Sequence, residues 1–232
     1  MTQVTAIVPA RGRSQGIPLK NLKEINGDSL VGIAARHGIE AGNINQTVVN
    51  SDHPEIRAAG EEYGAEVMDR PDRFTQDDSV QEVDRLLRWC VEQLEADGPN
   101  IDVVVLLYPT APLRTVETVE ETVSRVADDE HDSALTLYED DSYLWERDDE
   151  TVSPTNYDPK KRGPRQKEDW NQWVENKAVY AMNRDLLMEA GCRLGGSTGY
   201  VEMPEWRSVD VDAPRDLELA RLLSKNPPSD DV

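Results

Sequence analysis

Cysteine, histidine and phenylalanine are rare in this chain, which has two Cys, three His and one Phe among its 232 residues. Cys90 and Cys192 have no Cys or His neighbours at a zinc-binding spacing, so we expect buried or half-buried thiols in a reducing compartment. His37, His53 and His131 are scattered along the chain. Their separation disfavours a catalytic centre built on histidine.

Long apolar runs are missing as well. No stretch of the sequence approaches the roughly 20 consecutive apolar residues that are needed to cross a bilayer. The first apolar run begins almost at the N-terminus, and no secretory signal pattern precedes it. We therefore expect a cytoplasmic protein that does not act on a membrane.

Positive charge is scarce too, because 25 Lys and Arg stand against 46 Asp and Glu, for a formal net charge of -21. This balance argues against nonspecific binding to nucleic acid, which requires positive charge facing phosphate. It leaves either an ordinary acidic protein or a surface adapted to high salt, where screening weakens the repulsion between like charges. Because the acidic excess is spread along the whole chain, we favour a halophilic, salt-adapted protein.

Strand and helix patterns alternate through the first 140 residues. We expect strands at residues 3–8, 46–52, 65–71, 101–109 and 133–139, and helices within residues 25–42, 53–64, 77–98 and 115–131. The strand at 101–109 is apolar without alternation, as expected for a central parallel strand that is covered on both faces. The order predicts a doubly wound α/β fold with a mostly parallel sheet and right-handed crossovers.

Local signals support several of these helices. Asp28 or Ser29 can cap the N-terminus of the first helix and Thr115 that of the last one, while Pro54 suits the first turn of the second. The helix within residues 77–98 carries one apolar stripe, formed by Val80, Val83, Leu86, Leu87, Cys90, Val91 and Leu94. A stripe of this kind predicts a helix that packs against the sheet along one face.

The pattern changes near residue 140. Residues 141–176 are polar and contain several tryptophans and a basic cluster, and this stretch is too long for a simple loop. We interpret it as an inserted lobe that could be β-rich, and we expect it to form a contact between two copies of the chain. Residues 1–140 and 177–225 then form one α/β domain, and residues 226–232 form a flexible tail.

A basic loop rich in Gly and Pro, "ARGRSQGIPLKN", follows the first strand. It matches neither the G-x-G-x-x-G fingerprint nor the Walker loop. Arg11, Arg13 and Lys20 could nevertheless hold a triphosphate and stabilise a pyrophosphate leaving group, helped by backbone N–H groups at the small residues of the loop. The alternative is a solvated basic loop that pairs with nearby acidic side chains.

An acidic pair stands near the C-terminus, in residues 199–223, for which we expect two short strands, an acidic turn and a final helix. Asp210 and Asp212 alternate on an extended segment, so both carboxylates face one side. A divalent ion such as Mg²⁺ relieves their repulsion, and phosphate oxygens complete its coordination. The alternative is an ordinary acidic pair of the kind that recurs through the chain, but the flanking Val209 and Val211 favour a site.

Ligands of open α/β sheets gather at the carboxyl ends of the strands. The basic loop, residues 50–52 and the segment "YPTAPLR" all follow strands and are expected to meet at this edge. In that segment Pro109 and Pro112 make the chain rigid around Thr110. Taken alone, the segment also fits a simple turn from strand to helix.

These motifs, in this order, resemble those of the acylneuraminate cytidylyltransferases, also called CMP-sialic acid synthetases. The matching segments are "VPARGRSQGIPLKNL", "NSDHPEI", "RPDRFTQDDS", "LLYPTAPLR", "PRQ", "NKAVYAMN" and "VDVDAPRDLELA". The resemblance implies a nucleotide-diphospho-sugar transferase-like fold with a small dimerisation lobe. It also implies a homodimeric, Mg²⁺-dependent enzyme that joins CTP to an acidic nine-carbon sugar and releases pyrophosphate.

The resemblance also assigns site residues. For the nucleotide they are Ala10, Arg11, Gly12, Arg13, Lys20, Asn21 and Arg70. For the sugar acid they are Tyr108, Thr110, Arg165, Gln166 and Lys177. For Mg²⁺ they are Asp210 and Asp212. The catalytic set is Arg11, Lys20 and Asp212, and from the mechanism we expect Asp212 to help deprotonate the attacking hydroxyl, directly or through a metal-bound water.

Three positions depart from the family pattern. The family usually has Lys at Gln15, Gln at Tyr108 and Asn-Gly at Asn176 and Lys177. Two of these departures lie on the sugar side, so N-acetylneuraminate, legionaminate, pseudaminate and other acidic sugars stay open. A nucleotidyltransferase of the same fold for the eight-carbon Kdo or for another nucleotide, and a non-catalytic nucleotide-binding relative, are the alternatives.

Overall fold

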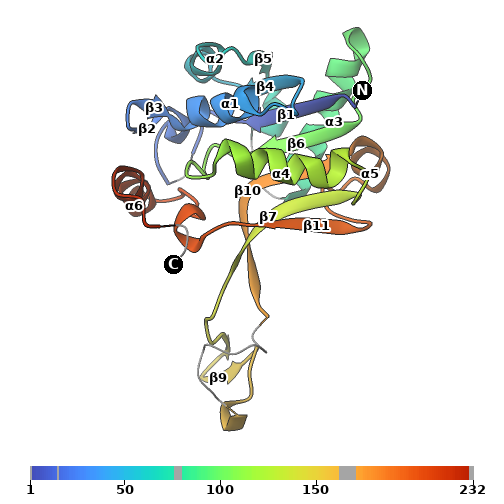
Figure 1. Ribbon diagram of the computed structural model, residues 1–232. Coiled ribbons are helices and arrows are strands. Elements are labelled where there is room, and N and C mark those ends of the chain that lie inside the picture. Colours follow the sequence, from blue (N-terminus) through green and yellow to red (C-terminus); the bar gives the residue numbers. More distant parts are fainter. Residues whose placement is uncertain (1, 15, 76–79, 162–170, 230–232) are drawn as a thin grey trace.

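The computed structural model describes the chain apart from residues 1, 15, 76–79, 162–170 and 230–232. Seven strands form its central sheet in the order β11-β7-β10-β6-β1-β4-β5 (Figure 1). Their bounds are β1 (Val4–Pro9), β4 (Gln46–Ser51), β5 (Glu66–Asp69), β6 (Val103–Leu107), β7 (Ser133–Glu139), β10 (Trp173–Asn183) and β11 (Thr198–Glu202). All neighbouring pairs in this sheet are parallel except those of β10 with β6 and β7. The predicted, mostly parallel α/β sheet is confirmed.

Helices cover both faces of the sheet. The described residues form α1 (Leu30–Glu40), α2 (Pro54–Glu61), α3 (Val80–Asp97), α4 (Val116–Ala127), α5 (Arg184–Ala190) and α6 (Pro214–Lys225). Apolar residues of α1, α2 and α4 share one core cluster with the sheet, whereas those of α3 and α5 share a second cluster on the opposite face (Figure 1). Across the described ranges, none of the helices is both long and apolar enough to span a membrane.

The strand β6 lies in the middle of this arrangement. Val103, Val105 and Leu107 point into the first cluster, and Val104 and Leu106 point into the second. None of these five side chains is more than 2% exposed. This alternation between two buried faces is the reason for the unbroken apolar run in the sequence.

The predicted capping and packing signals are confirmed where the structure describes them. The Ser29 hydroxyl accepts a hydrogen bond from Gly32 N at 3.1 Å, and the Thr115 hydroxyl accepts one from Thr118 N at 3.2 Å. Five members of the α3 stripe are buried in the second cluster and Leu94 is partly buried against it. The side chain of Val80 lies outside the described part of the structure.

A third apolar cluster joins segments that are far apart in the sequence. It contains Ile17 from the basic loop, Leu30 from α1, Val211 from the acidic segment and Leu217 from α6. Burial of these apolar side chains brings the basic loop and the acidic segment together. The charged groups of the two segments therefore meet because their neighbouring apolar residues share one core.

The second strand expected within residues 199–223 is wrong. The chain there forms β11, a short 3-10 helix at Glu205–Arg207 and then an irregular stretch at residues 208–213. In that stretch Val211 N donates to Thr110 O at 2.8 Å, which ties it to the loop after β6. Alternating polar and apolar residues suggested a strand, but the partner is a loop and no ladder forms.

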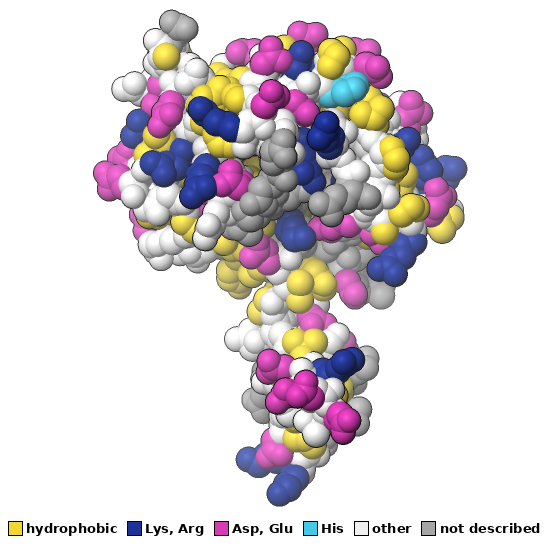
Figure 2. Space-filling model, turned by 180° about the vertical axis from the view of Figure 1, so that it is seen from behind, with side chains coloured by type: hydrophobic (Ala, Val, Ile, Leu, Met, Phe, Trp, Pro, Cys, Tyr) yellow, Lys and Arg dark blue, Asp and Glu magenta, His cyan; other side chains and the backbone are white. Residues whose placement is uncertain are grey.

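The predicted insertion carries a small hairpin, β8 (Trp145–Asp148) paired with β9 (Thr151–Pro154). It projects from the body of the molecule on a stalk formed by the ends of β7 and β10 (Figures 1 and 2). The strand β10 begins at Trp173, inside the range assigned to the insertion, because Trp173 pairs with Glu139 of β7. The sheet therefore continues into the base of the stalk.

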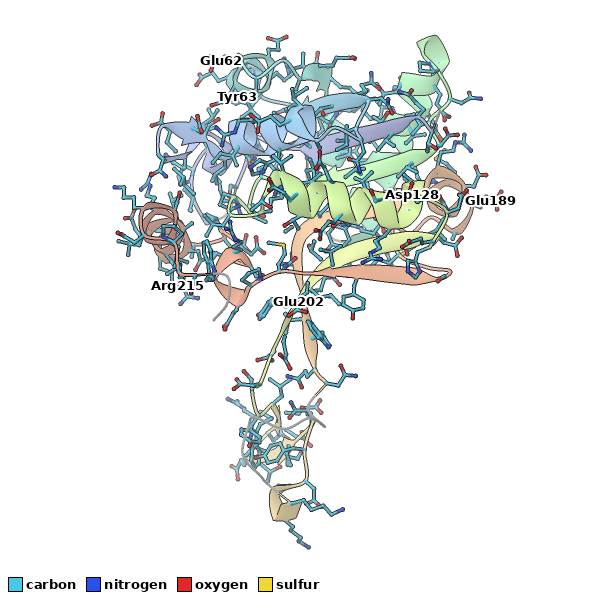
Figure 3. The ribbon with its side chains drawn as sticks, in the orientation of Figure 1. Glu62, Tyr63, Asp128, Glu189, Glu202 and Arg215 are labelled. Carbon is cyan, nitrogen blue, oxygen red and sulfur yellow. The ribbon has the colours of Figure 1, made fainter. Side chains whose placement is uncertain are left out.

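Acidic side chains lie on many sides of the molecule. Glu62 and Asp128 follow α2 and α4, Glu189 lies in α5 and Glu202 ends β11, and all four are exposed (Figure 3). The acidic excess is therefore spread over the surface, as the sequence indicated. The two cysteines are free thiols, with Cys90 buried and Cys192 partly buried, as predicted.

Candidate functional site

A cavity of about 530 Å³ opens at the carboxyl ends of the parallel strands. Pro9 at the end of β1 and Tyr108 after β6 contribute to its wall. Ten of the predicted site residues line it, namely Arg11, Arg13, Lys20, Asn21, Arg70, Tyr108, Thr110, Lys177, Asp210 and Asp212. The sequence motifs thus meet at the edge of the sheet where an α/β fold binds its ligands.

Two of the described predicted site residues, Ala10 and Gly12, do not line this cavity. Ala10 is buried and its N–H donates to Asn50 O at 2.9 Å, while the Gly12 N–H donates to Asp52 Oδ1 at 2.7 Å. Both N–H groups therefore brace the loop. Arg165 and Gln166 lie outside the described residues, as does Gln15.

The basic loop is closed by a hydrogen bond between its ends and approaches the acidic segment at its middle. Buried Asn21 donates through Nδ2 to Arg11 O at 2.9 Å, which closes the loop on itself. Gly16 lies so close to the acidic segment that a Cβ built there would be 2.2 Å from Asp212 O. A side chain at this position would push the loop away from Asp212, so the glycine permits the close approach.

Positive charge reaches the cavity from two directions. Arg70, in the loop after β5, is 7% exposed and donates through Nε to Phe74 O at 3.0 Å. Burial lowers the pKa of Arg70 from its ordinary value, Asp52 opposes this shift and Arg11 adds to it. Guanidinium groups held side by side in this way attract an anionic ligand.

Each carboxylate of the acidic pair is held by a lysine. Lys20 Nζ lies 2.8 Å from Asp212 Oδ1, and Lys177 Nζ lies 2.8 Å from Asp210 Oδ2. The hydrogen bond to Asp210 raises the pKa of Lys177 above its ordinary value. Both carboxylates line the same cavity, as predicted from their spacing.

The carboxylate pair fits a magnesium ion that is completed by a ligand. Asp210 Oδ1 is buried and has no hydrogen-bond partner among the described residues, so one oxygen is available to a cation. No group of three or more His, Cys, Asp or Glu side chains suited to a metal is found in the part of the chain that the structure covers. Mg²⁺ commonly binds through one or two carboxylates together with waters and substrate phosphates, which matches this donor set.

The segment "PTAPLR" is braced from inside the protein. Arg114 is 2% exposed and donates through Nη1 to Tyr108 O at 2.7 Å and to Ala111 O at 2.8 Å. Burial lowers the pKa of Arg114 to about 9. The arginine thus fixes the backbone that carries Tyr108 and Thr110 into the cavity.

Sequence reasoning missed a buried ion pair at the cavity wall, which Arg193 lines. Arg193 Nε lies 2.6 Å from Asp84 Oδ1, with both side chains about 5% exposed or less, and Arg193 Nη1 donates to the Tyr108 hydroxyl at 2.7 Å. Tyr108 also packs edge-on against Tyr180 at 6.2 Å between ring centroids. The sequence held one signal for this pair, because Asp84 stands next to Val83 of the apolar stripe on α3. A carboxylate buried there requires a positively charged partner.

Lys177 stands at a special backbone position. Its φ is 59°, in the left-handed region that favours glycine, at a register shift in β10 between Glu175 and Tyr180. This conformation accounts for the glycine that the family usually has here. In this chain the position instead carries an ammonium group into the cavity.

A family model described as cytidylyltransferase matches residues 5–195 of the chain, and the acidic pair lies beyond the matched segment. N-acylneuraminate cytidylyltransferase A of Danio rerio is 30% identical over 222 residues, which cover 94% of this chain and 50% of the relative. Pseudaminic acid cytidylyltransferase of Campylobacter jejuni is 24% identical over 225 residues, covering 94% of this chain and 95% of that one. The chain spans about half the length of the N-acylneuraminate cytidylyltransferases that it matches in fishes.

Solved structures show the same fold. A CMP:2-keto-3-deoxy-manno-octonic acid synthetase complexed with CTP superposes with a TM-score of 0.67 at 18% identity, over 98% of this chain and 100% of the other. The expected nucleotide-diphospho-sugar transferase-like fold is thereby confirmed. At this identity the likeness is one of architecture.

Proposed function

The chain belongs to the cytidylyltransferase family, and we propose that it is a nucleotidyltransferase that joins CTP to a sialic-type sugar acid. The products are a CMP-sugar and pyrophosphate. The observation that carries the proposal is the meeting of Arg11, Lys20 and Arg70 with Asp210 and Asp212 in one cavity. Cations for a triphosphate and carboxylates for a divalent ion are the parts that phosphoryl transfer requires.

The proposed reaction is an in-line displacement. The anomeric hydroxyl of the sugar attacks the α-phosphorus of CTP, an O–P bond forms, and the bond to the β-phosphate oxygen breaks. Arg11, Arg13 and Lys20 lie where they can neutralise the phosphates and the leaving pyrophosphate. Asp210 and Asp212 would hold a Mg²⁺ ion, which supplies charge stabilisation at the phosphate oxygens.

Two further roles complete the proposal. Asn21 at the end of the basic loop and Arg70 after β5 contact the cytidine in this proposal, since both line the cavity. Asp212 helps to remove the proton of the attacking hydroxyl, and its exposed carboxylate is available to substrate. On the family resemblance, Arg165 and Gln166 approach the sugar acid from the insertion, reaching across a homodimer.

The substrate class rests on the named relatives. One is described as acting on N-acylneuraminate and another on pseudaminic acid, and both are nine-carbon acids. The Tyr108 hydroxyl and the Lys177 ammonium on the sugar side suit a ligand with hydroxyl and carboxylate groups.

Pyrophosphate release tests the proposal. The purified chain is incubated with Mg²⁺ at high salt, with each of four nucleoside triphosphates and with N-acetylneuraminate, legionaminate, pseudaminate or Kdo. We expect release with CTP and at least one nine-carbon acid. Tight CTP binding without turnover on any acid would reject the enzyme, and a preference for UTP or GTP would reject the cytidine assignment.

The acidic pair provides a matched test of the site. Asp212→Asn should lower kcat at least about 100-fold, because it weakens the binding of Mg²⁺ and removes the base proposed for the attacking hydroxyl. The control is Asp129→Asn, which makes the same chemical change near the amino ends of the strands, away from the cavity. Asp129 has a φ of 58°, which Asn tolerates. Full activity in the Asp212 variant would show that the metal and base assignments are wrong.

A further inference from the structure

The backbone around Lys177 is fixed from inside the protein. Asn176 is 4% exposed, and its Oδ1 accepts hydrogen bonds from Ala178 N at 3.1 Å and from Thr136 Oγ1 at 2.6 Å. These bonds close the register shift in β10 on both sides of Lys177. The direction of the lysine side chain therefore follows from a buried network, and the ammonium is delivered to Asp210.

The ion pair that results is asymmetric. The Lys177 side chain is 54% exposed, whereas the Asp210 side chain is 23% exposed. Lysine occupies Oδ2 of the carboxylate at 2.8 Å, and the buried Oδ1 has no hydrogen-bond partner among the described residues. The lysine is thus the member of the pair that has room to move, on a flexible four-carbon stem.

We propose that Lys177 is a tethered cation with two positions, which holds Asp210 in the ligand-free protein and moves to the carboxylate of the sugar acid when a divalent ion takes Asp210. This inference rests on the proposed function. An ammonium group and a divalent cation compete for the same carboxylate, because each neutralises its charge. Once displaced, the ammonium remains beside Tyr108 in the cavity wall, where a substrate carboxylate restores its charge balance.

The consequence is a coupling between two ligands. Binding of the divalent ion releases Lys177 for the sugar acid, and binding of the sugar acid draws Lys177 away from Asp210. By linkage each ligand then raises the affinity of the other by the same factor. A family member with the usual glycine at this position has no ammonium group there, and therefore lacks this coupling between the divalent ion and the sugar acid.

The first test measures the metal alone, without turnover. Mn²⁺ binding to the full chain is titrated by electron paramagnetic resonance for wild type, Lys177→Gly and Lys177→Arg. We expect Lys177→Gly to bind Mn²⁺ about two- to fivefold more tightly, since partly exposed ion pairs contribute up to about this factor. Lys177→Arg keeps the cation and should stay near wild type, and equal Mn²⁺ affinity in all three proteins would overturn the proposal.

A charge control separates competition from general electrostatics. Lys225 lies in the last turn of α6, whereas Asp210 and Asp212 precede the first turn of that helix, and Lys225→Gln also removes one positive charge. We expect its Mn²⁺ affinity to match wild type. A gain as large as that of Lys177→Gly would show that net charge, rather than Lys177, sets the affinity.

The second test measures the coupling itself. Binding of N-acetylneuraminate and of pseudaminate is followed by calorimetry, with and without Mg²⁺ and a non-hydrolysable CTP analogue. Wild type should bind its sugar acid more tightly in the presence of Mg²⁺, and Lys177→Gly should lose that gain. An unchanged gain would overturn the transfer of Lys177 to the sugar acid. Failure to bind either acid would count against the proposed function, whereas the Mn²⁺ titration still decides the competition.

Discussion

At the residue scale, His37 is a titratable side chain that is buried in the fold and lies outside the cavity lining. The side chain is 7% exposed on α1, and its Nδ1 has no hydrogen-bond partner within the described residues. Burial, together with Arg114 and Arg36, lowers the pKa of His37 to about 3. A pKa this low leaves the imidazole neutral in the folded protein near neutral pH.

This histidine predicts a pH-dependent loss of stability. In the unfolded chain His37 takes up a proton below its ordinary pKa of 6.5, but in the folded protein it stays neutral until about pH 3. The unfolded state thus gains protons as the pH falls, which should lower the free energy of unfolding by about 2 kcal/mol between about pH 7.5 and 5. Urea unfolding of wild type and His37→Leu over this range measures the effect.

The difference between the two proteins isolates His37, because carboxylate titration is common to both. The variant should lose less stability than wild type as the pH falls. Parallel curves of unfolding free energy against pH would mean that His37 titrates normally in the fold.

At the scale of elements, the basic loop depends on one glycine. A Cβ at Gly16 would lie 2.2 Å from Asp212 O, so Gly16→Ala must push the loop away from the acidic segment. Because Lys20 and Asp212 are brought together by that contact, we expect Gly16→Ala to weaken CTP binding at least tenfold, or by about 1.4 kcal/mol. Isothermal titration with CTP and Mg²⁺ measures the loss.

A second glycine serves as the control for this variant. Gly27 lies in the turn between β2 (Glu24–Ile25) and β3 (Asp28–Ser29), with φ of 95° and nothing near a built Cβ. Gly27→Ala should lower stability by about 1 kcal/mol through backbone strain and leave CTP binding intact. Equal CTP affinity in both variants would reject the role assigned to the loop.

We expect the hairpin formed by β8 and β9 to contribute to the contact between two copies of the chain. Leu144, Trp145 and Val152 are 46%, 50% and 60% exposed, an apolar surface of the kind that marks a protein contact. We expect wild type to sediment as a dimer at micromolar concentration and Trp145→Asp to sediment as a monomer, since a buried Trp can contribute 2 kcal/mol or more to an interface. Leu222→Asp alters an exposed leucine on α6 and should remain dimeric. If wild type sediments as a monomer, or if Trp145→Asp sediments as a dimer, the hairpin does not form the predicted dimer contact.

How far the sequence predicts these elements depends on how local the signal is. The buried strand β6 and the Thr115 cap follow from neighbouring residues, and both were predicted. The pairs Lys20–Asp212 and Asp84–Arg193 join residues 192 and 109 positions apart, and no local pattern links them. The same limit explains the strand wrongly expected near Val211, because only the folded protein shows that its neighbour is a loop.

At the scale of the whole molecule, the net charge of -21 predicts a dependence on salt. Like charges spread over the surface repel one another, and salt shortens the screening length from about 10 Å at 0.1 M to about 3 Å at 1 M. The unfolding temperature should therefore rise steeply with KCl in this range and level off above it. Calorimetry in a KCl series measures the rise, and a rise that only begins above 1 M would indicate preferential exclusion of salt instead.

The strand β10, which is antiparallel to both of its neighbours in the central sheet, also determines where the fold can accept an inserted segment. Because β7 ends and β10 begins at the same edge of the sheet, any segment placed between them emerges beside the cavity. Its length and composition can change while the ladders on either side keep their register. The stalk is thus a point at which one inserted segment can be exchanged for another, by evolution or by design, while the sheet stays unaltered.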